Sequence, residues 1–229
     1  MAHPNLFDYL VQYFSESATL GMNPVIILDT SAIIGLEQAH QKHYSFPFAC
    51  TFLDNLANCS PTGVQIIAPP QIKKEVIVHN GFKIAGRPEI SDQTTIKIQA
   101  LEDDQEMKLF QQEEYPKIDE NSYFLRQMYL DRMRGKKRDD DPISREDWSV
   151  IDTAMAYAVL GRHKFELNDN AGKPRRFAGT PKAAALSGDK HILWTIEEAL
   201  KQPEMVAVGT YLKAINVRDY TLVPQTSSR

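Results

Sequence analysis

Short apolar segments that lead directly into helical patterns constrain the fold of this chain more than any other feature. Residues 24–28 are a proline followed by four large apolar residues, which is typical of a buried strand. An Asp-Thr-Ser turn at residues 29–31 has helix-capping character, and a helical pattern begins directly after it. Residues 64–68 form a second strand pattern, which two prolines and another helix follow. This alternation predicts an α/β fold with a mainly parallel sheet.

The rest of the chain extends this organisation. We expect an N-terminal helix within residues 1–23 that packs on the core, and a tail over residues 219–229. Between them we expect, in chain order, a helix near residues 46–58, a helical insertion at about 80–142, a helix from 144 to about Gly161, an irregular basic loop at about 162–183, a short strand over 183–186, a helix over 191–200 and an edge strand at 205–208.

Composition limits the classes of protein. The chain has 229 residues, 42% hydrophobic and 24% charged, with a net charge of −4. This balance is ordinary for a globular protein and is not that of a strongly basic nucleic-acid-binding protein. No apolar run approaches the length of a membrane span, so we expect no membrane partner. Its two cysteines, Cys50 and Cys59, suit a reducing compartment, so we expect a cytoplasmic protein.

Four acidic residues stand near the beginnings or ends of ordered elements. Asp29 follows the first strand, and Asp189 follows the 183–186 strand. Glu75 lies on the helix after the second strand, and Asp147 lies in the first turn of a long helix. Ligands bind beyond the carboxyl ends of strands in a parallel sheet, so these side chains can converge there. Clustered carboxylates bind hard divalent cations such as Mg²⁺ or Mn²⁺.

The third acid is ambiguous. On a helical wheel Asp147 falls in the middle of the apolar stripe formed by Val150, Ile151 and Ala154, where a carboxylate is costly unless it is paired or bound to metal. Asp152 falls on the flank of that stripe and is a second candidate. Residues 144–147 also match a capping box, with Asp in the place of the usual Glu.

Each carboxylate also has an ordinary structural explanation. Asp29 could simply cap a helix, Glu75 could be a surface charge, and Asp189 could be a turn residue. The four acids together, in this order along the chain, are what indicate a site.

These segments resemble those of PIN-domain ribonucleases. The resemblance rests on four stretches: Val-Ile-Ile-Leu-Asp29-Thr30-Ser31, residues 66–76 with Glu75, residues 147–154 with Asp147, and Ala-Leu-Ser187-Gly188-Asp189. It implies a three-layer α/β/α nuclease domain over residues 24–218. The insertion and the long basic loop depart from compact members of the family.

The resemblance implies an endonuclease that hydrolyses RNA phosphodiester bonds with Mg²⁺ or Mn²⁺. Asp29 and Asp189 would be direct metal ligands, while Glu75 and Asp147 would complete the shell, bind a second metal or orient water. Hydrogen bonds that support the acids are expected from Thr30, Ser31 and Ser187. Contacts to phosphate are expected from Lys73, Lys74, Lys190, Arg175 and Arg176.

Two other functions remain open at this point. The chain could be a catalytically weak PIN-like module that binds RNA or a protein partner, or the toxin of a toxin–antitoxin pair. A homo-oligomer or a protein regulator is compatible with either. A haloacid-dehalogenase-like phosphatase is disfavoured, because it needs a second Asp two residues after the first, where this chain has Ser31.

Overall fold

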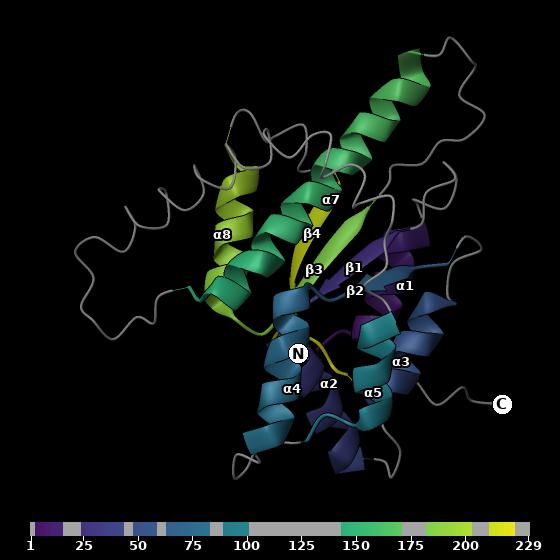
Figure 1. The fold of residues 1–229 in the computed structure, drawn as a ribbon. Coiled ribbons are helices and arrows are strands. Elements are labelled where there is room, and N and C mark those ends of the chain that lie inside the picture. Colours follow the sequence, from purple (N-terminus) through teal and green to yellow (C-terminus); the bar gives the residue numbers. More distant parts are fainter. Residues whose placement is uncertain are drawn as a thin grey trace, which may run out of the picture.

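A parallel β-sheet forms the centre of the structure, a computed structural model that describes residues 3–15, 24–43, 48–58, 63–82, 89–100, 143–170, 182–202 and 211–222. Figure 1 shows the arrangement of its elements. In chain order they are α1 (Leu6–Ser15), β1 (Val25–Leu28), α2 (Thr30–His43), α3 (Phe48–Ala57), β2 (Gln65–Ile67), α4 (Pro70–Phe82), α5 (Asp92–Ala100), α7 (Arg145–Asn170), β3 (Ala183–Ser187), α8 (Lys190–Leu200), β4 (Leu212–Asn216) and the 3₁₀ turn η1 (Val217–Asp219).

The strand order within the described residues is β2-β1-β3-β4, and all neighbouring strands are parallel. The chain therefore moves from β1 outward to β2, crosses back over β1 to β3, and continues in the other direction to β4. The winding direction reverses between the neighbouring strands β1 and β3. In open parallel sheets ligands bind at the carboxyl ends of the strands beside such a reversal. The predicted α/β fold with a parallel sheet is confirmed.

Helices cover both faces of this sheet. Helix α7 packs against β1, β3 and β4, and α8 packs beside it against β3 and β4. Helices α1 and α3 lie behind the other face (Figure 1). All four β1 residues are buried, as expected of a strand that is covered on both sides.

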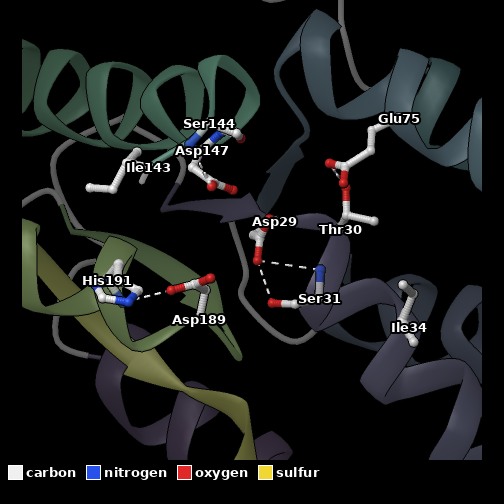
Figure 2. A pocket seen from close by; sticks show the side chains of 10 residues that line it. All are labelled: Asp29, Thr30, Ser31, Ile34, Glu75, Ile143, Ser144, Asp147, Asp189 and His191. Carbon is white, nitrogen blue, oxygen red and sulfur yellow. Dashed lines mark hydrogen bonds between the residues drawn. The ribbon is translucent and has the colours of Figure 1, made fainter. Parts of the chain in front are cut away.

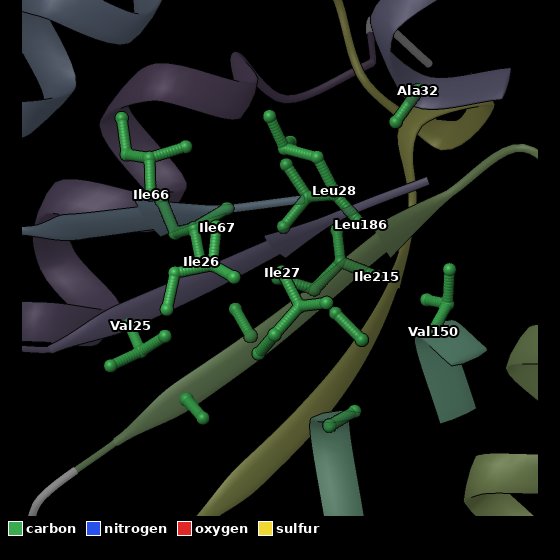
Figure 3. Packing of buried hydrophobic residues seen from close by; sticks show 14 of the residues in the cluster. Val25, Ile26, Ile27, Leu28, Ala32, Ile66, Ile67, Val150, Leu186 and Ile215 are labelled. Atoms are coloured by element: carbon green, nitrogen blue, oxygen red, sulfur yellow. The ribbon is translucent and has the colours of Figure 1, made fainter. Parts of the chain in front are cut away.

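The apolar core follows from these layers. Figure 3 shows that β1, β2, β3, β4 and α7 contribute side chains to one cluster. Ile27 of β1 pairs in register with Ile67 of β2 and with Ala185 of β3. The small alanines of β3 leave room for α7, whose Val150 and Ala154 are fully buried. This packing fixes the first turn of α7 near the carboxyl edge of the sheet.

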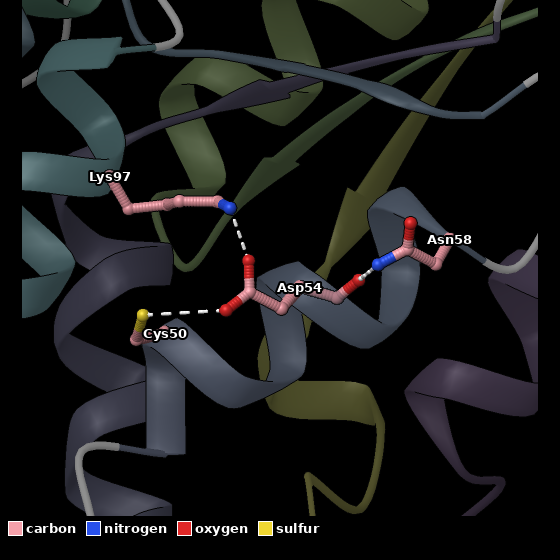
Figure 4. A network of polar contacts seen from close by, with 4 residues as sticks. All are labelled: Cys50, Asp54, Asn58 and Lys97. Atoms are coloured by element: carbon pink, nitrogen blue, oxygen red, sulfur yellow. Dashed lines mark hydrogen bonds and ion pairs between the residues drawn. The ribbon is translucent and has the colours of Figure 1, made fainter.

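Helix α5 is attached to the body by polar contacts. Glu37 of α2 is only 2% exposed and accepts hydrogen bonds from Thr94 Oγ1 at 2.6 Å and from Ser91 Oγ at 3.3 Å. On the α3 side, Lys97 forms an ion pair with Asp54, whose backbone carbonyl accepts from Asn58 and whose carboxylate accepts from Cys50 Sγ (Figure 4). These contacts place the start of the expected 80–142 insertion against α2 and α3.

The two ends of the described chain meet. Helix α1 buries Leu6, Leu10 and Phe14, as its sequence pattern predicts. Leu6 N donates to Thr221 O at 3.0 Å, and Thr221 N donates to Pro4 O at 2.8 Å. The prediction that a tail begins at residue 219 is therefore wrong by a few residues, because residues 219–222 belong to the folded body.

Other boundaries differ from those predicted. Helix α7 does not end at Gly161 but continues to Asn170, so the expected loop is helical over 162–170. One glycine inside a helix costs only about 1 kcal/mol, and neighbouring residues can offset that cost. Strand β4 lies at Leu212–Asn216 and was not predicted. The strand expected at 205–208 and most of the 80–142 insertion lie outside the described residues, as do residues 171–181 of the loop.

Candidate functional site

A pocket of about 520 Å³ opens at the carboxyl edge of the sheet, beside the β1–β3 reversal. Figure 2 shows that its side chains come from the turns that follow β1 and β3 and from the helices around them. It is lined by Asp29, Thr30, Ser31, Ile34, Glu75, Ile143, Ser144, Asp147, Asp189 and His191. The four acids singled out by the sequence thus line one pocket, although they come from segments far apart in the chain.

Asp29 is the most buried of the four, with 3% of its surface exposed. The β1–β3 ladder continues into it, because Asp29 N donates to Leu186 O at 3.1 Å. Its Oδ2 accepts from Ser187 Oγ at 2.7 Å, from Ser31 N at 3.3 Å and from Ser31 Oγ. The N-terminal turn of α2 and the end of β3 therefore hold the same carboxylate oxygen.

The electrostatic environment of Asp29 is unfavourable to its charge. Burial raises the pKa of Asp29 from 3.8 to about 6. Hydrogen bonds from Ser31 and Ser187 lower it, while the negative charges of Asp147 and Glu75 raise it further. These serines do not offset the burial, so a nearby cation would stabilise the ionised form.

Two serines join the ends of β1 and β3. Ser31 Oγ lies 3.2 Å from Ser187 Oγ and accepts from Gly188 N at 2.7 Å. Ser187 Oγ in turn accepts from Asp189 N at 2.8 Å. The turn that carries Asp189 is therefore tied through hydroxyl groups to the turn that carries Asp29.

Glu75 reaches the pocket from the second turn of α4. Its Oε2 accepts from Thr30 Oγ1 at 2.7 Å, in a contact that is partly buried. Burial raises the pKa of Glu75, the Thr30 bond and the charge of His79 lower it, and the charges of Asp147 and Glu146 raise it. Glu75 and Asp29 thus belong to one electrostatic group.

Asp147 and Asp189 each cap a helix. Ser144 N donates to Asp147 Oδ2 at 3.1 Å and Asp147 N donates to Ser144 Oγ at 3.0 Å, which is the predicted capping box at the start of α7. Asp189 is the N-cap of α8, and its Oδ1 accepts from His191 N at 2.6 Å. The capping box predicted for residues 144–147 is therefore confirmed, whereas Asp189, considered above as a turn residue, is a helix N-cap. Both carboxylates also line the pocket.

The four carboxylates share one property. In each, one oxygen accepts a hydrogen bond, while the other has no hydrogen-bond donor among the described residues. These second oxygens are Asp29 Oδ1, Glu75 Oε1, Asp147 Oδ1 and Asp189 Oδ2. In the same part of the chain, no three acidic, histidine or cysteine side chains are close enough together to hold one metal ion as they stand. The pocket gathers carboxylates without enclosing a cation position.

The other predicted residues divide into three groups. Thr30, Ser31 and Ser187 donate to the acids, as expected. Asp152, Lys73 and Lys190 do not line the pocket, whereas Lys74 lines an adjoining hollow of about 380 Å³ that shares Glu75 and Ser144 with it. Arg175 and Arg176 lie outside the described residues.

Sequence reasoning missed one cation near the site. Arg218 of η1 lies against Gly188, because a Cβ atom built on Gly188 would be 3.1 Å from Arg218 Nε and 3.3 Å from Ser31 Oγ. Arg218 follows β4, and an expectation of the final strand near 205–208 gave no reason to look at it. A correct placement of β4 would have put residues 217–219 at the carboxyl edge.

Comparison of the chain with protein-family models, curated proteins and solved structures finds no match. No helix in the described ranges is long and apolar enough to cross a membrane. The function must therefore be argued from the pocket itself.

Proposed function

We propose that this protein is a divalent-metal-dependent endoribonuclease of the PIN-domain type. One observation carries the proposal: Asp29, Glu75, Asp147 and Asp189 come from four separate segments and line a single pocket at the reversal point of a parallel sheet. A set of like charges that are partly buried opposes folding, and a divalent cation bound among the carboxylates would offset that cost.

The donor set fits a hard cation. All four acids offer carboxylate oxygens, and each retains one oxygen without a donor in the described part of the chain. Asp29 and Asp189 are the proposed direct ligands, because the serine hydroxyl groups tie their two turns together. Since the side chains do not enclose a cation position as they stand, binding would draw them inward.

The chain's own residues would prepare the reaction. Ser31 and Ser187 hold Asp29 in one orientation, and Thr30 holds Glu75. Glu75 and Asp147 would complete the ligand shell or orient the attacking water. Bound Mg²⁺ or Mn²⁺ would lower the pKa of that water and stabilise charge on the phosphoryl oxygens.

A nuclease assay on labelled single-stranded RNA tests this proposal. We expect cleavage in Mn²⁺, its loss in EDTA, and a loss of at least about a hundredfold in Asp29→Asn and in Asp189→Asn. Asp152→Asn is the matched control, because it removes one acid of α7 that does not line the pocket. Cleavage that survives both pocket substitutions would contradict the proposal.

A second function has one observation in its favour. Because no three of the described acidic, histidine or cysteine side chains can hold a metal as they stand, a catalytically weak module that binds RNA or a protein partner fits the same fold. This alternative predicts RNA or partner binding with no Mn²⁺-dependent cleavage. The assay above separates the two.

A further inference from the structure

Arg218 is an exposed cation held in one place beside the acidic pocket. Its guanidinium lies on Gly188, where an added Cβ would be 3.1 Å from Nε and 3.5 Å from Nη2. Gly188 itself is buried, and its backbone N donates to Ser31 Oγ at 2.7 Å. The guanidinium therefore contacts the short turn between Ser187, which bonds Asp29, and Asp189. No other arginine in the described residues packs on that turn.

This guanidinium has no counter-ion among the residues that the structure describes. Among the described residues, no carboxylate lies within ion-pairing distance of Arg218, and its only hydrogen bond runs from its backbone N to Asn216 Oδ1 at 3.1 Å. The four pocket acids are near the turn that it touches, yet none of them pairs with it. Within the described part of the chain, the five N–H donors of this planar group are thus available to a ligand.

The chemical class of the ligand follows from the guanidinium group of Arg218 and from its position near the acidic pocket. Guanidinium binds phosphate and carboxylate through two parallel hydrogen bonds. A pocket of four carboxylates repels a phosphodiester, so a strand that enters it needs a fixed positive charge at the edge. Arg218 does not line the pocket itself, but its guanidinium lies against Gly188, the residue before Asp189, and would supply that charge there.

We propose that Arg218 binds a backbone phosphate of the RNA strand and positions it at the acidic pocket. The identity of the ligand as RNA rests on the proposed function. Gly188 allows this position of the guanidinium, because a Cβ at residue 188 would be 3.1 Å from Arg218 Nε and would require it to shift. Arg218 is a positioning residue in this account and takes no part in the chemical step.

Binding without cleavage tests the proposal. The probe is a short fluorescein-labelled single-stranded RNA, titrated with the full chain in EDTA and followed by anisotropy. We expect Arg218→Ala to weaken binding about fivefold to tenfold. Arg218→Lys retains the charge but not the paired donors, so it should recover part of the loss. Lys201→Ala removes an exposed cation at the far end of α8 from Asp189 and should bind as the parent does.

Salt dependence separates a phosphate contact from a structural role. Each lost contact to a single strand reduces the slope of log K against log salt by about 0.7. We expect this reduction in Arg218→Ala and not in Lys201→Ala. A parent-like affinity and slope in Arg218→Ala, or equal losses in both variants, would overturn the proposal.

A second variant tests the position of the guanidinium without removing its charge. Gly188 does not have a left-handed backbone, so alanine is compatible with its conformation. Its Cβ would lie 3.1 Å from Arg218 Nε and 3.3 Å from Ser31 Oγ, so these atoms would have to shift by a few tenths of an ångström. Gly188→Ala should weaken RNA binding in the parent and have little further effect when Arg218 is already alanine. An equal loss in both backgrounds, or no loss in either, would overturn the role of the Gly188 contact.

The two proposals fail in different ways. If the chain binds RNA through Arg218 but never cleaves it in Mn²⁺, the proposed function is wrong and the phosphate contact stands. If it cleaves RNA while Arg218→Ala binds and cleaves as the parent does, the phosphate contact is wrong and the proposed function stands.

Discussion

Thr30 Oγ1 donates a hydrogen bond to Glu75 Oε2 at 2.7 Å (Figure 2). This bond connects the turn after β1 to the second turn of α4, and it holds the Glu75 carboxylate at the pocket. Thr30 also follows directly after Asp29, whose carboxylate is buried. One turn of the chain therefore positions two of the four pocket acids.

Replacing Thr30 by valine removes this donor and keeps the shape of the side chain. The Thr30 bond lowers the pKa of Glu75, so its loss raises that pKa. If Glu75 must be ionised, the acid limb of the pH–rate profile for RNA cleavage should move to higher pH in Thr30→Val. Thr95→Val, which loses only a local bond to Ser91 O on α5, is the control. An unmoved acid limb in Thr30→Val would show that Glu75 does not need to be charged.

Asp29 should make the metal-free protein less stable as the pH rises. Its folded pKa of about 6 is above the ordinary 3.8, so the folded state binds the proton more tightly. The stability that the protonated Asp29 contributes is complete below about pH 4 and is lost as the pH rises through about 6. Above that pH, the ionised carboxylate lowers the free energy of unfolding by about 3 kcal/mol relative to the protonated one. Asp29→Asn has no such titration.

Urea unfolding in EDTA across this pH range measures the effect. We expect the stability of Asp29→Asn, relative to the parent, to improve between about pH 4 and pH 7. A difference between the two proteins that stays constant over this range would mean that Asp29 titrates normally in the fold.

Helix α5 should depend on one buried carboxylate. Glu37 is 2% exposed and accepts from Thr94 Oγ1 at 2.6 Å and from Ser91 Oγ at 3.3 Å. Glu37→Ala leaves the buried Thr94 hydroxyl without its acceptor, while Ser91 Oγ can still donate to Thr94 Oγ1 at 2.8 Å, so we expect a loss of about 2–3 kcal/mol in the free energy of unfolding. Glu37→Gln retains a carbonyl oxygen and should lose less. A loss below about 0.5 kcal/mol in Glu37→Ala would mean that α5 is held by other contacts.

The sequence predicted those parts of the site in which one local pattern determines the structure. The Val-Ile-Ile-Leu run is typical of a buried strand, and the structure contains that strand with Asp29 at its carboxyl end. The Ser144–Asp147 spacing predicted the capping box that the structure contains. Asp147 rather than Asp152 lines the pocket, in agreement with the helical wheel.

What the sequence did not predict depends on contacts between distant segments. Gly161 suggested the end of a helix, but α7 continues to Asn170. Strand β4 at the sheet edge buries only Leu212 and Ile215 of its five residues, so its sequence lacks the regular alternation that would indicate a strand. Without β4 the place of Arg218 cannot be deduced. The Thr30–Glu75 bond joins residues 45 positions apart and has no local signature either.

Direct measurement of Mn²⁺ binding tests the central claim, which is that the four carboxylates form one cation site. Isothermal titration calorimetry should be carried out on the parent, Asp29→Asn, Asp189→Asn and the control Asp152→Asn. We predict saturable binding by the parent and the control, weakened at least about tenfold by either pocket substitution. Binding that is absent from the parent, or that is equally strong in all four proteins, would contradict the account.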